Sequence, residues 1–326
     1  MRASVTQPVP QSLRDRSAPV PFRELRPSRF ARVRRAAANF WTSFLFWNAR
    51  RYPALPRVSK PFWMWAGWTF TPVLRETTLS NAARLLGPDS TPAQREALAR
   101  AVIANFYDFV CDIGAALGMS RRELLDQIDK VEGHERYVDA RRDGKGAIVV
   151  TAHMGSFEVG MAALLEQEKR VHVLFRRDDL GEFEKTRTAL RRRLGVHEAC
   201  VEDGLAVWMN LRAALARDEV VLIQGDRVLP GQKGEPVPFL GGHMMLPTGP
   251  VKLALATGAP IVPVFSVRTP DGKIRLFIED PIRVRGEVHD AVLRLGKVIE
   301  NYVRRFPDQW LVFHRPWCED AAPENH

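Results

Sequence analysis

The stretch AIVVTAHMGSFE, residues 147–158, joins a continuous apolar β-type run to a polar turn and the start of a helical pattern. An uninterrupted run of this kind predicts a strand at 147–151 that is buried on both faces. The following residues predict a helix from about Ser156 to Gln167. Ligands of open α/β sheets gather beyond the C-terminal ends of the strands. His153 and Glu158 are therefore candidate functional residues.

Downstream of this stretch, strand-like and helical patterns alternate. Short β-branched runs predict strands, and apolar residues at helical spacing predict the helices between them. Such alternation indicates one catalytic-size α/β domain with a mostly parallel sheet covered on both faces. The predicted strands are 171–175, 220–224, 261–267 and 273–278, and the predicted helices are 183–194, 205–216, 249–257 and 290–305, with a Gly/Pro-rich loop at 225–242.

Upstream, two helix starts can be read directly. The sequences TPAQ (91–94) and SRRE (120–123) are capping boxes, in which the first and fourth residues satisfy each other's backbone N–H groups. The proline of the first box occupies the first helical position, which favours a helix start. We predict a long helix from residue 92 through at least 113 and a shorter helix that ends near residue 130.

The composition limits the class of protein. The chain has 326 residues, of which 45% are hydrophobic and 26% charged, so it can bury a large core and is not wholly disordered. Its three cysteines are widely spaced and form no disulfide framework, which favours a reducing compartment. The net charge is +10, but residues 1–60 alone carry +11 and the remainder −1. The basic excess is thus confined to an N-terminal arm.

Two uncharged segments of 14 residues follow this arm, at 36–49 and 61–74, and they contain five of the eight tryptophans. Both are shorter than the roughly 20 residues that a membrane-spanning helix needs. Tryptophan favours the membrane interface, and flanking arginines are attracted to anionic headgroups. These features favour association with a membrane surface. There are two alternatives. The arm is a solvated tail followed by helices that pack on the protein's own core, or it is a mitochondrial-type transit peptide.

The pair His153 and Glu158 suits general base catalysis. A carboxylate that holds one imidazole nitrogen fixes the tautomer, so that the other nitrogen can take a proton from an attacking hydroxyl. The spacing alone is not specific, because His197 and His314 also precede a glutamate by five positions. Only His153 stands at the end of an apolar strand, beside Gly155. The alternative is a histidine satisfied by the local backbone at a helix start.

Other chemistries lack their motifs. The chain has no G-x-S-x-G nucleophile elbow, no H-E-x-x-H or Cys/His zinc pattern, and no glycine-rich nucleotide loop. We therefore expect no metal and no organic cofactor. The neutral body and the absence of a recognition motif also argue against nucleic-acid binding.

The His-x₄-Glu sequence between a strand and a helix resembles the hallmark of the glycerolipid acyltransferase superfamily. The order of the downstream motifs is similar to that of the lipid A biosynthesis (lauroyl/myristoyl) acyltransferases, a branch that also includes enzymes that acylate phosphatidylinositol mannosides. The resemblance covers about residues 75–315. It rests on LFRR (174–177), the helix that contains Arg187 and closes on LG (194–195), GL (204–205), VVLIQGDR (220–227), GEPVPFLG (234–241) and TGAPIVPV (257–264).

The resemblance implies a mostly parallel central sheet flanked by helices and preceded by N-terminal interfacial helices. It implies transfer of a fatty acyl group from a thioester, on acyl carrier protein or coenzyme A, to a hydroxyl of a membrane lipid such as a lipid A precursor or a lysophospholipid. By the same resemblance His153 is the base and Glu158 its partner. The implied substrate-binding residues are Arg176, Arg187, Asp226, Arg227, Phe239 and Gly241, although Phe239 is equally compatible with a buried loop anchor.

We thus expect a basic arm at 1–35, Trp-rich membrane-interface segments at 36–75 and an acyltransferase domain at 76–326. The expected location is peripheral or monotopic at the inner membrane, with the active site on the cytoplasmic side and an anionic membrane surface as partner. Many relatives begin with one clear transmembrane helix, and this chain offers only the two short segments. Hydrolysis of a thioester or lipid ester at the same site, and a non-enzymatic membrane-binding scaffold, are the competing hypotheses.

Overall fold

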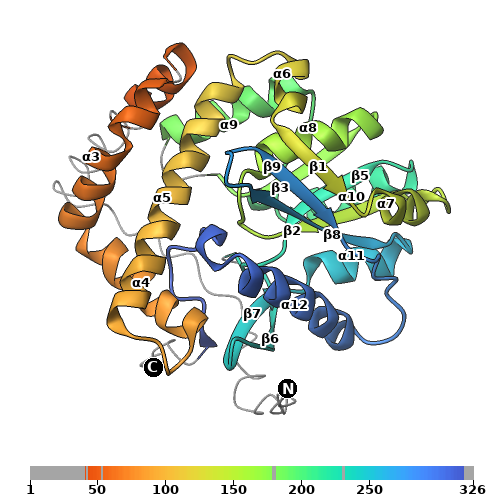
Figure 1. Cartoon of the computed structure of the whole chain (residues 1–326). Coiled ribbons are helices and arrows are strands. Elements are labelled where there is room, and N and C mark those ends of the chain that lie inside the picture. The colour runs from red at the N-terminus through yellow and green to blue at the C-terminus, as the bar shows by residue number, and fades with distance from the viewer. Residues whose placement is uncertain (1–40, 42, 53, 178–180, 230–231, 319–326) are drawn as a thin grey trace.

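The computed structural model describes residues 41, 43–52, 54–177, 181–229 and 232–318 (Figure 1). The basic arm predicted at 1–35 lies outside the described residues.

A seven-stranded sheet lies at the centre of the structure. Its strands are β1 (Ile128–Glu132), β2 (Ala147–Thr151), β3 (Val171–Phe175), β4 (His197–Cys200), β5 (Val220–Gln224), β8 (Ile261–Arg268) and β9 (Ile274–Ile278). Their order across the sheet is β1-β9-β8-β2-β5-β3-β4. Neighbours run parallel, except that β9 turns back antiparallel to β8. The predicted α/β class with a mostly parallel central sheet is confirmed.

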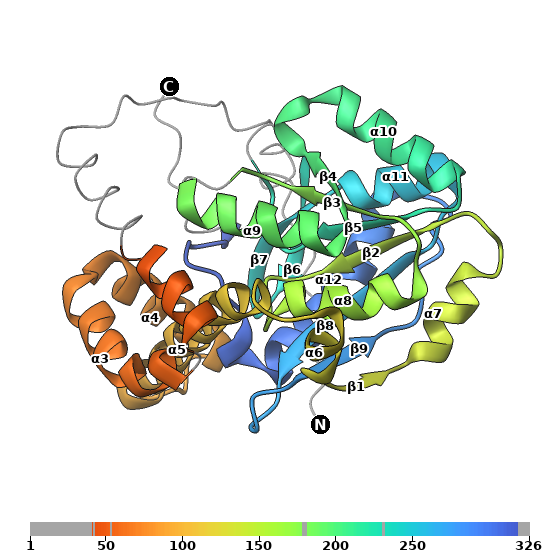
Figure 2. The same ribbon diagram turned by 90° about the horizontal axis from the view of Figure 1, so that it is seen from above.

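Helices cover both faces of this sheet, as Figure 2 shows. One face carries α7 (His134–Arg141), α8 (Phe157–Gln167) and α9 (Gly181–Leu194), and the other carries α10 (Leu205–Ala216), α11 (Gly249–Thr257) and α12 (Val288–Arg305). Strand β2 is buried throughout, and its alternate side chains enter two different apolar clusters. Ile148 and Val150 pack with the second group of helices, and Ala147 and Val149 with the first. Burial on both faces explains the uninterrupted apolar sequence of this strand.

The N-terminal part adds a layer of helices at one end of the sheet. Residues 43–51 are helical and are followed by α3 (Ala54–Phe70), α4 (Pro72–Leu86), α5 (Pro92–Ala116) and α6 (Arg121–Asp126). Both predicted capping boxes are present at the starts of α5 and α6. Figure 1 places α5 between the outer helices and the sheet. In the part of the chain that is described, no helix is both long and apolar enough to cross a membrane.

Two predictions of local structure are wrong, and a further strand of the sheet was not predicted. The helix expected to reach residue 130 ends at Asp126, because the chain then joins the sheet as β1. The expected loop 225–242 contains a strand of the hairpin β6 (Gly234–Phe239) and β7 (Gly242–Pro247). Its prolines are tolerated because this two-stranded hairpin leaves every second N–H of β6 without a ladder partner. The short edge strand β4, which begins at His197, was not predicted.

Candidate active site

A cleft of about 390 Å³ lies at the C-terminal ends of β2, β3 and β5. His153 and Gly155 line it after β2, and Arg176 and Arg177 line it after β3. This is the edge at which open α/β sheets collect their ligands. The remaining wall includes Phe106 and Phe109 of α5, Phe183 and Arg187 of α9, Trp208 of α10, and Arg227, Leu311 and Phe313 from loops.

His153 forms its side-chain hydrogen bond with Asp226. The His153 Nδ1 lies 2.7 Å from Asp226 Oδ1, and the backbone N–H of His153 donates to Oδ2 over 2.9 Å. The imidazole is 29% exposed at the cleft, whereas the Asp226 side chain is fully buried. The pair therefore presents a histidine to the cleft and keeps its carboxylate partner out of water.

The register of the sheet brings these two residues together. Strands β2 and β5 are adjacent and parallel, and their last residues, Thr151 and Gln224, are paired. His153 and Asp226 each follow two positions later, so they stand side by side. The turn after β2 depends on Gly155, which has a φ of +53° and whose added Cβ would lie 2.4 Å from the Ser266 carbonyl oxygen. A larger residue at this position would displace the turn.

The charge on Asp226 fixes the state of the histidine. Burial by itself raises the pKa of Asp226, but the charge and hydrogen bonds of His153, together with a bond from Trp310, lower it to about 2. The carboxylate is thus ionised and can only accept hydrogen bonds. Because Asp226 accepts at Nδ1, that nitrogen carries the ring proton. The Nε2 of neutral His153 is left as the acceptor, which is the arrangement that a general base requires.

Glu158 does not hydrogen-bond to His153, and the predicted pairing of these two residues is corrected here. Glu158 Oε1 accepts from Arg187 Nε over 2.9 Å, and its Oε2 is buried with no hydrogen-bond partner among the described residues. The physical reason is that Glu158 is the second residue of α8, whose first turn faces α9. Burial raises the pKa of Glu158, although the positive charges of Arg187 and Arg191 act to lower it.

This glutamate belongs to a buried ionic network that fixes α9 against α8. Arg191 is nearly fully buried and lies 3.1 Å from carboxylate oxygens of Glu184 and of Glu198. Its guanidinium also lies 4.2 Å from the centre of the Phe175 ring. Arg187 extends from this network into the cleft and is 14% exposed. Glu158 therefore sets the position of an arginine in the cleft.

The other predicted site residues divide into two groups. Arg176, Arg187 and Arg227 line the cleft together with His153. Phe239 is buried, with its ring 5.8 Å from that of Trp310, and is not among the described residues that line the cleft. Gly241 lies in the turn between β6 and β7 and borders a different cavity.

Two residues near the pair were not predicted. Trp310, from the segment after α12, donates its indole N–H to Asp226 Oδ2 over 2.9 Å. His314 is close enough to Asp226, Arg227 and His153 to interact with their charges. Its burial, and to a smaller extent the positive charge of Arg227, lower its pKa to about 4. Both residues lie far along the chain from His153. The one sequence signal for Trp310 is that its indole N–H, set among apolar residues, needs a hydrogen-bond partner when it is buried.

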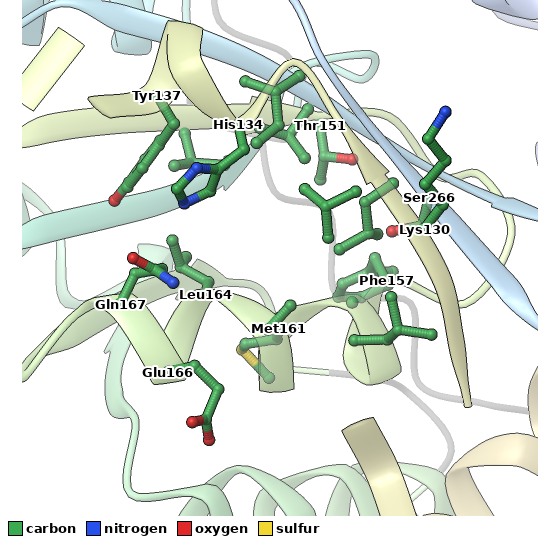
Figure 3. Close-up of a pocket in the computed structure, with 18 of the residues that line it drawn as sticks. Lys130, His134, Tyr137, Thr151, Phe157, Met161, Leu164, Glu166, Gln167 and Ser266 are labelled. Atoms are coloured by element: carbon green, nitrogen blue, oxygen red, sulfur yellow. The ribbon is translucent and has the colours of Figure 1, made fainter. Parts of the chain in front are cut away.

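A second cavity, of about 370 Å³, lies on the α8 side of the sheet. Figure 3 shows Phe157, Met161 and Leu164 on one side and Tyr137 and His134 across from them. Most of the lining is apolar. Phe157 lines this cavity and also the cleft that contains His153, so the two spaces are neighbours. Among the residues that are described, no group of three or more His, Cys, Asp or Glu side chains is placed to hold a metal ion.

Comparisons with known proteins identify the family of the chain. Residues 31–319 match the family described as bacterial lipid A biosynthesis acyltransferase. A phosphatidylinositol mannoside acyltransferase of Mycolicibacterium smegmatis is 22% identical over 75% of this chain and 80% of its own. One from Mycobacterium tuberculosis is 26% identical over 58% of this chain and 60% of its own. The chain belongs to the lipid A biosynthesis acyltransferase family and is an O-acyltransferase.

We expect Asp226→Asn to abolish acyl transfer while the protein stays folded. The amide can turn its NH₂ toward Nδ1, which forces the ring proton onto Nε2 and leaves no base. Loss of the correct tautomer costs roughly 10³-fold or more in turnover. Initial rates and thermal melts of the purified variant measure both effects.

Glu158→Gln is the matched control. It weakens the buried ion pair with Arg187, so we expect a lower melting temperature and a smaller loss of rate than in Asp226→Asn. The reverse ranking of the two rates would return Glu158 to the role of catalytic partner.

Proposed function

We propose that this chain transfers a fatty acyl group from an acyl thioester to a hydroxyl of a membrane lipid, with His153 as general base and Asp226 as the carboxylate that holds it. The observation that carries the proposal is the buried Asp226 beneath a cleft-facing histidine, in a member of an acyltransferase family. The arrangement needs no metal or organic cofactor, because the thioester already supplies an activated acyl group.

The reaction follows from the tautomer of His153. Its Nε2 takes the proton of the acceptor hydroxyl while the oxygen attacks the thioester carbonyl carbon. The resulting tetrahedral intermediate collapses with cleavage of the C–S bond. The imidazolium, stabilised by ionised Asp226, returns the proton to the departing thiolate. The products are an ester and a free thiol, and the histidine is neutral again.

The arginines of the cleft suit a donor and an acceptor that carry phosphate. Arg176, Arg177, Arg187 and Arg227 all line the space in front of His153. Guanidinium groups bind phosphate with paired, charge-assisted hydrogen bonds. Acyl carrier protein and coenzyme A both present the thioester on phosphopantetheine, so either is a fitting donor. The acceptor we propose is a phosphate-bearing glycolipid, the class that contains lipid A precursors and phosphatidylinositol mannosides.

The apolar cavity behind Phe157 suits the acyl chain. It adjoins the cleft at Phe157, and its lining is formed mostly by aliphatic side chains of the sheet and α8. Transfer of methylene groups from water to such a cavity is favourable by about 0.8 kcal/mol each. We propose that the thioester carbonyl lies at His153 and that the chain passes Phe157 into this cavity.

The outer helices suit a membrane surface. Most of the large hydrophobic side chains that are exposed in the described residues lie between 41 and 73. They include Trp47, Phe62 and Trp65, beside the basic residues Arg50 and Arg57. Exposed aromatic groups next to positive charge favour an anionic bilayer surface. We propose peripheral or monotopic association with the cytoplasmic side of the inner membrane.

The acceptor can be tested by mass spectrometry of lipids from source cells that lack this protein. Cells restored with the wild-type chain should regain one acyl chain on one lipid class, and cells restored with His153→Ala should not, because the base is gone. The variant must reach the same cellular level as the wild type.

Equal restoration by His153→Ala would overturn the assignment of the base. Release of free fatty acid from a thioester with no acylated lipid would instead show a hydrolase. Unchanged lipids in both strains would favour the scaffold hypothesis.

The chain-length prediction uses two opposite substitutions in the apolar cavity. Ala163→Phe adds a ring to the lining, so we expect the preferred acyl chain to become shorter. Met161→Ala shortens a side chain of the same lining and so enlarges the cavity, and we expect longer acyl chains to be accepted. Competition between acyl thioesters of different length, read by product mass, measures both shifts. If both variants keep the wild-type preference, the acyl chain lies elsewhere.

The membrane prediction compares two pairs of exposed apolar residues. Phe62 and Trp65 on α3 are 58% and 54% exposed, and Leu205 and Met209 on α10 are 76% and 64% exposed. Replacing Phe62 and Trp65 by glutamate should weaken co-flotation with anionic phospholipid vesicles by about tenfold or more. The same change at Leu205 and Met209 should leave flotation unchanged. Equal effects of the two pairs would contradict the proposed surface.

A further inference from the structure

Among the described residues, three hydrogen-bond donors reach the buried carboxylate of Asp226. His153 supplies two of them, its Nδ1–H to Oδ1 and its backbone N–H to Oδ2. The third is the indole N–H of Trp310, which reaches Oδ2 over 2.9 Å. Because Asp226 is fully buried, no solvent can replace a missing donor. The orientation of the carboxylate therefore depends on this small set of bonds.

Trp310 is itself held rigidly. Its backbone forms a β-bridge with Met154, directly after His153. The next residue, Leu311, donates its N–H to the carbonyl of His153 over 2.7 Å. Trp310 is 2% exposed, and its ring packs against those of Phe239 and Trp317. The indole N–H is thus aimed at Asp226 by both the backbone and the aromatic packing.

We propose that Trp310 is a positioning residue for acyl transfer, which acts through Asp226 to set the orientation and the basicity of His153. The assignment rests on the proposed role of His153 as the base. Trp310 is not itself among the described residues that line the cleft, so we assign it to the orientation of Asp226 and not to substrate contact. Its indole N–H locks Oδ2, and this leaves Oδ1 facing Nδ1 of the imidazole.

The direction of the effect follows from the charge. A donor bonded to a carboxylate disperses part of its negative charge. Without the indole bond, Asp226 stabilises protonated His153 more strongly, and the ring then loses its proton only at higher pH. The rate requires the neutral ring, so the acid limb of the rate profile moves to higher pH. The carboxylate also gains freedom to rotate, which lowers the maximal rate.

Other charged and titratable groups surround the pair, and they remain unchanged when Trp310 is altered. His314 follows in the same C-terminal segment, and Arg227 is next to Asp226 in the chain. Across the cleft from His153, the charged residues are Arg176 and Arg177 after β3 and Arg187 on α9. Any shift in the acid limb that is specific to Trp310 therefore reports the lost indole bond.

The test is Trp310→Phe, with Trp317→Phe as its matched control. Both residues are buried, and both donate an indole N–H, but that of Trp317 goes to Asn81 Oδ1 over 3.1 Å. We expect Trp310→Phe to lower kcat by roughly tenfold and to move the acid limb up by about half a pH unit. Trp317→Phe should lower the melting temperature by a similar amount and leave the limb in place.

Site-specific replacement of Trp310 by benzothienylalanine gives a second variant, in which sulfur replaces the N–H in a ring of nearly the same shape. It keeps the test available if Trp310→Phe does not fold. The same shift in the acid limb is expected. A limb that coincides with the wild type in the folded variant would overturn the proposal.

The titration of the His153 ring, followed by NMR of histidine-labelled protein, separates this inference from the proposed function. If the wild type transfers no acyl group to any lipid, the proposed function fails, and the ring titration still decides the role of Trp310. A ring that titrates at the same pH with and without the indole N–H would exclude that role.

Discussion

The bond between Asp226 and His153 is the constraint on which the rest of the site depends. A fully buried carboxylate is costly unless its oxygens are satisfied, and here the two residues that follow neighbouring strands satisfy each other. This requires β2 and β5 to be adjacent and in register, and it requires the turn at Gly155 to pass close to Ser266. The same sheet that forms the apolar core therefore also fixes the tautomer of the histidine.

The glutamate of the His-x₄-Glu pattern serves a different purpose in this chain. Glu158 lies within the first turn of α8 and points to α9, where it holds Arg187 at the cleft. The pattern thus joins two parts of the site. Its histidine bonds to Asp226, which follows the adjacent strand, and its glutamate holds Arg187 at the cleft. Residues five apart in a strand–turn–helix unit need not touch in order to belong to one site.

Most of the architecture was predictable from the sequence, because β2, β5 and the main helices are long or strongly apolar. The hairpin of β6 and β7 and the short strands β1 and β4 were missed, since prolines and charged residues hide their pairing. The sequence pattern predicted His153 as a site residue, and the family resemblance implied Asp226 and three arginines. It could not pair Asp226 with the histidine, because chain order does not tell which strands are neighbours. Trp310 could not be assigned as a donor to Asp226, because it lies far along the chain and meets the carboxylate only in the folded structure.

Helix α5 lies between α3, which carries part of the proposed membrane surface, and the cleft that contains His153. On its outer side it carries α3, held by Lys60 to Asp108 at 2.7 Å and by the Tyr107 hydroxyl, which donates to the Pro56 carbonyl. On its inner side Phe106 and Phe109 line the cleft. A lipid whose headgroup reaches His153 while its tails stay in an apolar environment needs apolar side chains next to the cleft, because exposing the tails to water is costly. The position of α5 therefore supports the proposal that the exposed aromatic residues of α3 help to deliver the acceptor lipid as well as to bind the membrane surface.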